Sequence, residues 1–356
     1  MEVSHLLMVA GPLGGDGPSC RTLDLAREFT MRGLRVEVFT SGGAALPQSV
    51  RMGVPIFQHR GIRAGWFSGV IARSVLDRAR QFGPQVIHSQ SVTLSRVAAR
   101  LARASRCVYV VSCGTCAEAS QRLYSSRRFR GIIAPDEGVR EDLVNKASIP
   151  KSHIRVIPDG IDVDSPPPPH AGSHVPVVGM VAPAERGEGQ DDFLHAARLL
   201  TDRGIEAQFV VGGAGPLLGR HRRLAAKLGI QRLVTFACRV THYRSVLGAA
   251  DVLVVPSLRD GNTRLVLDAI ACQRPVVATG TGCLPNIIRD GETGLLVHKN
   301  SPEEIADAVA VLLSDAPLAE RLTRAAIALV TEHYNLAQMV ERTLDFYDRA
   351  ANRELS

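Results

Sequence analysis

The sequence is poor in aromatic residues and has no long apolar run. Aromatic side chains make up 4% of the 356 residues, with one tryptophan, too few for a surface that stacks nucleic-acid bases. No uninterrupted apolar stretch reaches the roughly 18 residues that a membrane-spanning helix needs. The first apolar run, HLLMVAG, follows no basic segment and ends in a glycine turn, so we interpret it as a buried strand and not as a signal peptide. We expect a cytoplasmic protein that does not bind nucleic acid.

The sequence also lacks the spacings that bind metals. It contains no HxxxH pattern and no cluster of cysteine and histidine, so we predict no metal site. The 7 cysteines are odd in number and scattered, as expected of thiols in a reducing compartment. Cys113 and Cys116 form a CxxC pair after an apolar run. Two interpretations stay open for this pair: a redox dithiol, or two thiols in a turn.

Positive charge is in modest excess, with 42 Lys and Arg against 35 Asp and Glu and a formal net charge of +7. This excess favours anionic partners such as phosphates or acidic lipids, although a solvated basic surface is the alternative. The segment RGIRAGWFSGVIARSVLDRAR combines Trp66 and Phe67 with several arginines. It fits either an amphipathic helix in peripheral contact with an anionic membrane, at its inner face, or an ordinary domain helix with a basic outer side.

What the sequence does contain is a repeated alternation of short apolar strands and amphipathic helices, typical of a parallel sheet covered on both faces. The first half contains the strand candidates HLLMVAG, VEVFT, VIHSQ, CVYVVS and GIIAP, and the second contains VVGMVA, AQFVVGG, LVTFAC, DVLVVPS, PVVAT and GLLVH. Between them, four consecutive prolines in IRVIPDGIDVDSPPPPHAGSHVP predict a stiff linker. We therefore predict an α/β protein of two Rossmann-like parallel-sheet domains, residues 1–164 and 165–334.

We expect a C-terminal helix at about residues 335–352 to pack back on the first domain. In such sheets, ligands bind at the carboxyl ends of the strands, where helix N-termini and glycine turns present N–H groups to anions. With two domains facing each other, the cleft between them is the expected site.

The richest stretch is ADVLVVPSLRDGNTRLVLDAIACQRPVVATGTGCLPNIIRDGETGLLV. Gly261, Asn262 and Thr263 predict a turn that caps a helix beginning near Arg264, with free N–H groups for a diphosphate. Asp260 lies in this turn and Asp268 eight positions later. These carboxylates can hold sugar and ribose hydroxyls, whereas the alternative is a turn acid and an acid on the helix surface.

This stretch resembles the donor-sugar motif of retaining GT-B glycosyltransferases, especially those of family 4. The segments IRVIPDGID, VVGGAGPL, LVTFACRV and GGDGPSCRTLDLARE resemble further parts of that family. The resemblance implies the GT-B fold and transfer of a sugar, with retention of configuration, from a nucleoside diphosphate donor. The acceptor would be a hydroxyl of a sugar, a lipid-linked compound or a small molecule, in polysaccharide or glycolipid biosynthesis. The family is generally metal-independent and needs no cofactor.

The resemblance also assigns roles to residues. It implies that Asp260, Asp268, His88 and Cys113 form the catalytic site. In this site Asp260 positions the donor sugar, Asp268 binds the ribose and Cys113 lies near the transferring sugar. We expect His88 at a strand end that faces the cleft, although a purely structural role for it stays open. The residues that we expect to bind the donor are Gly14, Gly15, Arg186, Glu188, Gly213, Gly215, Arg239, Val240, Gly261, Asn262, Thr263, Arg264 and Leu265.

Several positions depart from the family pattern. The family usually has glutamates where this chain has Asp260 and Asp268, and often a histidine where it has Cys113. An ungapped alignment of GMVAPAERGEGQDDFL places Pro183 and Glu188 where the family has an arginine and a lysine. Two lost charge-assisted contacts would remove about 3 to 6 kcal/mol of diphosphate binding. We expect Arg186 or Arg264 to replace that charge.

These departures motivate an alternative function. A catalytically reduced family member would bind a sugar nucleotide or a partner enzyme without turnover. An epimerase or a phosphorylase on the same architecture is disfavoured, because the acidic spacing follows the transferase pattern and no lysine stands out as a pyridoxal site.

Overall fold

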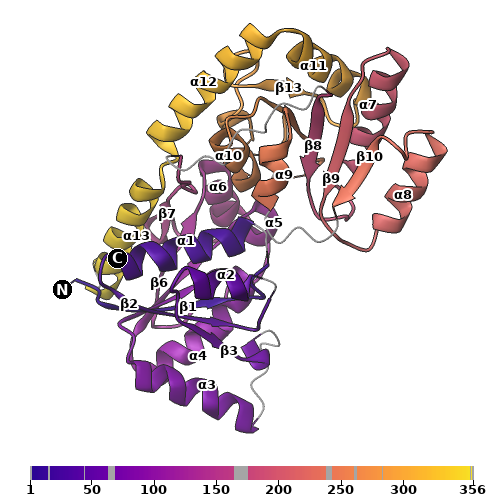
Figure 1. Cartoon of the computed structure of the whole chain (residues 1–356). Coiled ribbons are helices and arrows are strands. Elements are labelled where there is room, and N and C mark those ends of the chain that lie inside the picture. The colour runs from indigo at the N-terminus through magenta and orange to yellow at the C-terminus, as the bar shows by residue number, and fades with distance from the viewer. Residues whose placement is uncertain are drawn as a thin grey trace. The chain divides into compact units, whose positions relative to one another are not determined.

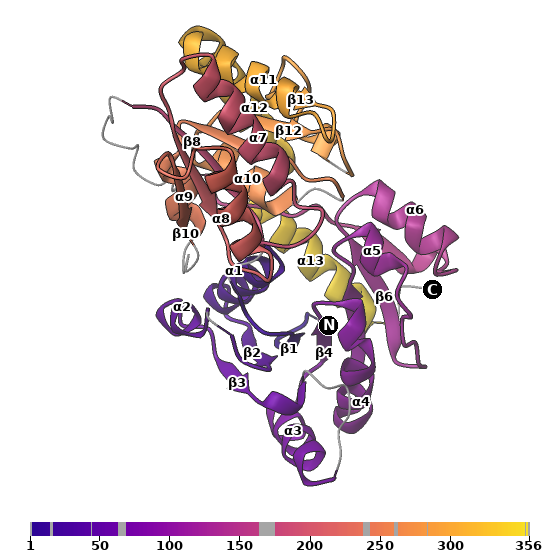
Figure 2. The same ribbon diagram turned by 90° about the vertical axis from the view of Figure 1, so that its right-hand side faces the viewer.

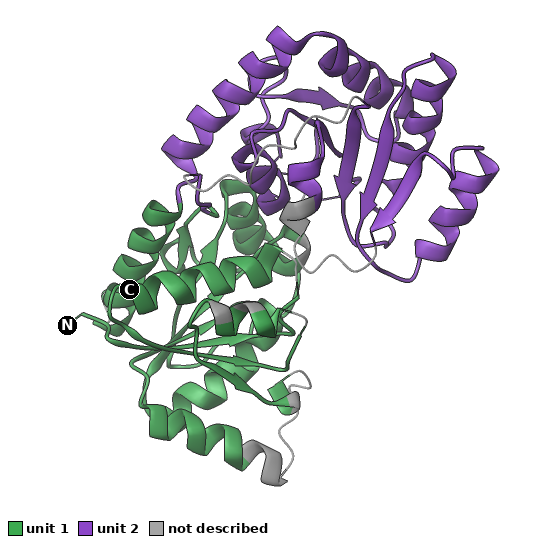
Figure 3. Ribbon diagram, viewed as in Figure 1, with its two compact units in different colours: residues 1–159, 336–356 green, residues 160–335 purple. Residues whose placement is uncertain are grey.

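The structure is a computed structural model of the chain, and it divides into two compact units (Figure 3). Unit 1 comprises Met1–Asp159 and Leu336–Ser356, and unit 2 comprises Gly160–Asn335. The described residues are 2–14, 17–43, 45–62, 69–163, 175–237, 243–259, 263–282, 284–352 and 354. The proline run of the expected linker and the Trp66–Phe67 pair lie outside these ranges.

Unit 1 contains a seven-stranded sheet in the order β3-β2-β1-β4-β5-β6-β7, and every pairing is parallel (Figure 1). The strand order reverses between β1 and β4, which is the switch point at which such sheets bind ligands. The strands are β1 (His5–Ala10), β2 (Arg35–Thr40), β3 (Ile56–Gln58), β4 (Val86–Ser89), β5 (Val108–Ser112), β6 (Phe129–Ala134) and β7 (Ile154–Val156).

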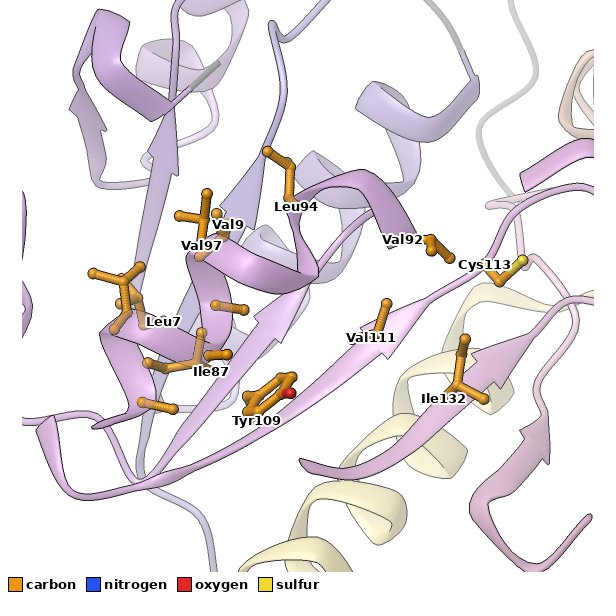
Figure 4. Packing of buried hydrophobic residues seen from close by; sticks show 14 of the residues in the cluster. Leu7, Val9, Ile87, Val92, Leu94, Val97, Tyr109, Val111, Cys113 and Ile132 are labelled. Carbon is orange, nitrogen blue, oxygen red and sulfur yellow. The ribbon is translucent and has the colours of Figure 1, made fainter. Parts of the chain in front are cut away.

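Helices cover both faces of this sheet. They are α1 (Gly17–Met31), α2 (Leu46–Arg51), α3 (Gly69–Phe82), α4 (Ser95–Ser105), α5 (Cys116–Ala119), α6 (Glu137–Asn145) and α13 (Leu336–Ala351). Because successive strand residues point to opposite faces, Leu7 and Val9 join the core under α3, α4 and α6 (Figure 4), whereas Leu6 and Met8 join the core under α1 and α13. Both faces are therefore apolar, as a fully covered parallel sheet requires.

Unit 2 contains a six-stranded sheet in the order β10-β9-β8-β11-β12-β13, again entirely parallel (Figure 2). Its strands are β8 (Val177–Val181), β9 (Gln208–Gly212), β10 (Val234–Ala237), β11 (Val252–Val255), β12 (Val276–Thr279) and β13 (Leu295–Val297). Its helices are α7 (Gln190–Asp202), α8 (Leu218–Lys227), α9 (Tyr243–Ala249), α10 (Thr263–Ala271), α11 (Pro302–Ser314) and α12 (Ala316–His333). The switch point of this sheet lies between β8 and β11.

The predicted fold class of two Rossmann-like parallel sheets is confirmed. Glycines end helices where the sequence indicates, for instance Gly33 after α1, with a φ of 87° that suits a helix C-cap. The short elements β3, β7 and α2 were not predicted, because their three to six residues carry too little periodicity to be recognised.

Candidate functional site

The carboxyl edge of the unit 2 sheet brings together three loops, which follow β8, β9 and β11. The N–H of Leu258 donates to the carbonyl of Gly187 at 2.9 Å, and the N–H of Ala184 donates to the carbonyl of Ala214 at 3.0 Å. Backbone N–H and carbonyl groups of the three loops are thus hydrogen-bonded to one another. These bonds lie beside the switch point, where the sheet topology predicts a ligand-binding site.

Glycines allow these loops to approach so closely. A Cβ atom on Gly189 would lie 1.9 Å from the carbonyl oxygen of Pro256, and one on Gly213 would lie 2.0 Å from that of Ala182. Both glycines have positive φ angles, 80° and 128°. A Cβ atom on Gly215 would lie 2.5 Å from the carbonyl oxygen of Ala184. Backbone packing therefore requires glycine at Gly213 and Gly215, whether or not they contact a ligand.

A polar pocket of about 320 Å³ opens beside the loops. Arg220 and Asp191 form an ion pair in it at 2.5 Å. The His221 side chain is buried, and its Nδ1 has no hydrogen-bond partner among the described residues. Burial lowers the pKa of His221, whereas Asp191 raises it. The pocket is lined by Glu185, Arg186, Gly187, Gly189, Gln190, Asp191, Asp192, Leu217, Arg220, His221 and Leu258.

Helix α10 contains the next expected site residues. The Nε of Arg264 donates to Oδ2 of Asp268 at 3.0 Å, and the two side chains are 4% and 0% exposed. The interpretation of Asp268 as an acid on the helix surface is therefore wrong. Arg264 also donates from Nη1 to the carbonyl of Gly160 at 3.4 Å. In this conformation Oδ2 of Asp268 accepts a hydrogen bond from Arg264. Thr263 begins the helix, and the Leu265 side chain is buried.

The loop after β8 contains the positions that depart from the family pattern. Pro183 is exposed and accepts a hydrogen bond from Nε2 of Gln190 at 2.6 Å through its carbonyl. Arg186 is exposed and lines the pocket. Glu188 is partly buried, and burial together with the charge of Glu185 raises its pKa, whereas the Arg259 guanidinium lowers it.

Arg259 is exposed and was not among the predicted site residues. A Cβ atom on Gly187 would lie 2.5 Å from the Nε atom of Arg259, so its side chain passes directly over Gly187. The signal that could have revealed it is its position, one residue before Asp260 in the motif.

In unit 1, His88 lies inside the protein and not at an open strand end. It is fully buried in β4, with Nδ1 at 2.6 Å from the Tyr347 hydroxyl and Nε2 at 2.8 Å from the Ser112 hydroxyl. Burial lowers the pKa of His88 to about 3, with a smaller contribution from Arg21. The imidazole is therefore neutral at physiological pH, and its hydrogen bonds fit the structural interpretation.

Cys113 is buried directly after β5, beyond Val111 (Figure 4). Burial raises the pKa of its thiol to about 12, and the carboxylate of Glu118 acts in the same direction. Cys113 and Cys116 are not joined in a disulfide. Because a redox dithiol needs an accessible thiolate, the structure favours the interpretation of two turn thiols.

The remaining predicted residues divide into two groups. The N–H of Gly14 donates to the Ser19 hydroxyl at 2.9 Å beside the start of α1. The residues outside the described ranges are Gly15, Arg239, Val240, Asp260, Gly261 and Asn262.

Among the described residues, no group of three or more His, Cys, Asp or Glu side chains is arranged to hold a metal ion. Within the same part of the chain, no helix has the length and apolarity needed to cross a membrane.

Two protein families match the chain. Residues 175–315 match the family described as "Glycosyl transferases group 1", and residues 16–165 match "Glycosyltransferase Family 4". The D-inositol 3-phosphate glycosyltransferase of Corynebacterium jeikeium is 35% identical over 208 residues, 52% of this chain and 49% of that protein. The chain thus spans about half the length of this relative. The enzyme of the same name from Nocardia farcinica is 26% identical over 97% of this chain and 88% of its own length.

Among solved structures, a crystal structure of the Anabaena protein HepE in complex with UDP and glucose is similar to the chain. The TM-score is 0.80, the identity is 16%, and the match covers 96% of this chain and 98% of that chain. At this identity the similarity shows a shared fold.

Proposed function

Because the chain belongs to glycosyltransferase family 4, we propose that it transfers a sugar from a nucleoside diphosphate donor to a hydroxyl acceptor, with retention of anomeric configuration. The observation that supports this most directly is the carboxyl edge of unit 2, where glycine-dependent loops after β8, β9 and β11 meet beside a polar pocket. Backbone N–H groups and helix N-termini at such an edge suit a diphosphate.

We assign the donor roles as follows. Gly261, Asn262 and Thr263 bind the diphosphate, and Asp260 positions the sugar. Asp268 accepts the ribose hydroxyls. Arg264, which pairs with Asp268 in this conformation, adds positive charge on the donor side.

Catalysis on this scheme depends on positioning and electrostatics. Holding the donor and the acceptor hydroxyl together removes most of the entropic barrier of a bimolecular reaction. Cations and backbone N–H groups around the diphosphate stabilise the negative charge that develops on the leaving group. His88 and Cys113 contribute structure to unit 1 in this proposal, because both side chains are buried and uncharged near neutral pH.

The acceptor is proposed from the relatives. The enzymes from Corynebacterium and Nocardia are named for D-inositol 3-phosphate, so we propose a polyhydroxylated small molecule as the first acceptor to test. Contact with an anionic membrane is a separate proposal based on the basic segment around Trp66, and sedimentation with phosphatidylglycerol vesicles tests it.

A thermal-shift panel with UDP, GDP, ADP and their glucose conjugates tests donor binding. We expect one nucleotide to raise the melting temperature of the wild type, and expect Asp268→Asn to reduce that shift. Asparagine keeps the shape of the side chain, so this variant disturbs the Arg264 contact less than alanine. If no nucleotide raises the melting temperature, the proposed function is wrong. Clear binding without transfer to any acceptor and without donor hydrolysis would favour the non-catalytic alternative.

A further inference from the structure

The pocket between α7 and α8 of unit 2 contains polar groups to which the proposed function assigns no role. The two helices pack against each other, and the first turn of each lines the pocket together with Leu258 from the loop after β11. Its volume of about 320 Å³ lies at the lower end of the usual range for small-molecule sites, about 300 to 1,000 Å³. The pocket is therefore large enough for one small ligand.

Three polar side-chain atoms at this pocket have no hydrogen-bond partner among the described residues. They are Oδ1 of Asp191, Oδ2 of Asp192 and Nδ1 of His221, and all three side chains line the pocket. His221 is 2% exposed, and its Nε2 lies 3.6 Å from Oδ1 of Asp191, too far for a hydrogen bond. A buried polar atom without a partner costs free energy, so a ligand that supplies the missing partners gains affinity.

The charge state of His221 decides what its Nδ1 can do. Burial lowers the pKa of His221 more than Asp191 raises it, so the imidazole is neutral near pH 7. A neutral imidazole has one N–H group and one lone pair. Because the Asp191 carboxylate is the charged group nearest to Nε2, it favours the proton on Nε2 and leaves the lone pair on Nδ1. The three unpartnered atoms are thus all acceptors.

The first turn of α7 adds hydrogen-bond donors. Gly189 is the N-cap residue, and no side chain caps this end of the helix. The first N–H groups of a helix have no partner within it, and within the described part of the chain those of residues 190 to 192 find none elsewhere. The exposed guanidinium of Arg186 also lines the pocket. The pocket therefore presents donors and acceptors side by side.

This mixture of groups distinguishes between classes of ligand. With His221 neutral, the lining carries a formal charge of −1, since two guanidinium groups oppose three carboxylates, those of Arg186 and Arg220 against those of Glu185, Asp191 and Asp192. A phosphate would meet unpaired carboxylate oxygens. An ammonium group would meet N–H groups and the positive end of the helix dipole. A hydroxyl group donates as well as accepts, so a ligand with several hydroxyl groups satisfies both sets.

We propose that the pocket between α7 and α8 binds a saccharide or a similar polyol, whose hydroxyl groups donate to Asp191, Asp192 and Nδ1 of His221 and accept from the first turn of α7. Leu217 and Leu258 in the lining contact the C–H groups of the ring. The inference goes beyond the proposed function, because it concerns a free saccharide and needs neither a nucleotide nor transfer of a sugar.

Histidine ¹⁵N NMR spectra test where such a ligand binds. We expect His221 to be protonated at Nε2 in the free protein, and expect its Nδ1 resonance to shift when at least one of D-glucose, D-galactose, D-mannose and myo-inositol is added. The spectrum of His221→Asn identifies the resonance, because it lacks that signal. Inorganic phosphate and methylammonium are the probes for an anionic and a cationic ligand, and we expect both to bind more weakly than the best saccharide.

Saturation-transfer NMR measures the affinity for the saccharide that gives the largest shift. His221→Phe keeps a ring of similar size without polar atoms and is expected to weaken binding about tenfold, the effect of one lost hydrogen bond. His221→Asn places a carboxamide near the position of Nδ1 and is expected to bind within about threefold of the wild type. The control is His333→Phe, which replaces an exposed histidine at the end of α12 that pairs with Glu332, and we expect no change.

Three results would overturn the proposal: no shift of the His221 resonance with any of the saccharides, tighter binding of phosphate or methylammonium than of every saccharide, or wild-type affinity in His221→Phe. Because the probes are free saccharides, these results do not depend on whether the chain binds a nucleotide. A protein that binds a nucleoside diphosphate and no free saccharide would keep the proposed function and contradict this inference alone.

Discussion

His88 illustrates how burial decides the role of a residue type that is common in active sites. Both ring nitrogens contact side chains inside unit 1, and burial lowers the pKa to about 3. The unfolded chain has a histidine pKa near 6.5 and therefore binds a proton that the folded state excludes. The stability that the neutral imidazole provides is fully present above about pH 6.5 and is lost as the pH falls towards 3.

Replacing His88 by glutamine removes this pH dependence while keeping hydrogen-bonding groups. Between pH 7 and pH 5, we expect the free energy of unfolding of the wild type to fall by about 2 kcal/mol more than that of His88→Gln. Urea denaturation at both pH values measures the difference. An equal fall in the free energy of unfolding of the two proteins would show that His88 is not held neutral.

The ion pair of Arg264 and Asp268 predicts a second effect at the residue scale. Both side chains are buried, so Asp268→Leu removes the carboxylate that balances the buried charge of Arg264 and is expected to cost about 3 to 5 kcal/mol of stability. Arg264→Met is expected to cost a similar amount. Since the two losses share one interaction, the double variant should cost much less than their sum. Additive losses in chemical denaturation would contradict a coupled pair.

At the scale of elements, the loop contacts of unit 2 depend on glycine at particular positions. Gly189 and Gly204 have nearly the same backbone angle, with φ of 80° and 75°. A Cβ atom on Gly189 would lie 1.9 Å from the Pro256 carbonyl oxygen, whereas one on Gly204 would meet nothing within 4 Å. The two positions form a matched pair that differs only in the space available to an added Cβ atom.

Gly204→Ala is expected to cost about 1 to 2 kcal/mol, the penalty for alanine in the left-handed region. Gly189→Ala adds a backbone clash and is expected to cost several times more and to abolish nucleotide binding. Thermal denaturation and titration of the two variants measure both effects. Equal losses of stability in the two variants would mean that the β11 loop moves away easily from position 189. The loops after β8 and β11 would then not be packed rigidly against each other.

The sequence predicts elements better than it predicts side-chain partners. Strands β8 to β13 are evident from apolar runs and glycine turns, because burial on both faces demands such runs. The buried pairing of Arg264 with Asp268 also follows an i,i+4 spacing, but its burial depends on chain segments that no local pattern identifies. The close approach of the Arg259 side chain to Gly187 was not predictable, because Gly187 lies on another loop.

At the scale of the whole molecule, the last helix of the chain, α13, contributes buried residues to the core of unit 1. Helix α13 places Tyr347 on His88, 259 positions away in sequence, and places Phe346 so close to β6 that a Cβ atom on Gly131 would lie 2.9 Å from the Phe346 ring. The apolar face of α13 was predictable from its periodicity, whereas the hydrogen bond between Tyr347 and His88 was not, since it joins segments that are distant in sequence.

Deleting residues 336–356 is therefore expected to unfold unit 1 and to leave unit 2 folded. Hydrogen exchange should show lost protection in β4, β5 and α1, which lie under α13, and retained protection in β8 to β13. Unchanged protection of β4 and β5 would show that the remaining core suffices without α13.

The claim that the chain turns over a nucleotide sugar is tested most directly by following an α-linked donor, such as UDP-α-glucose or its GDP and ADP counterparts, by proton NMR. The account predicts release of the nucleoside diphosphate with the α-anomer of the sugar or glycoside appearing first, before mutarotation. Absence of diphosphate release from all the donors, with and without D-inositol 3-phosphate, or initial formation of the β-anomer, would contradict retaining transfer.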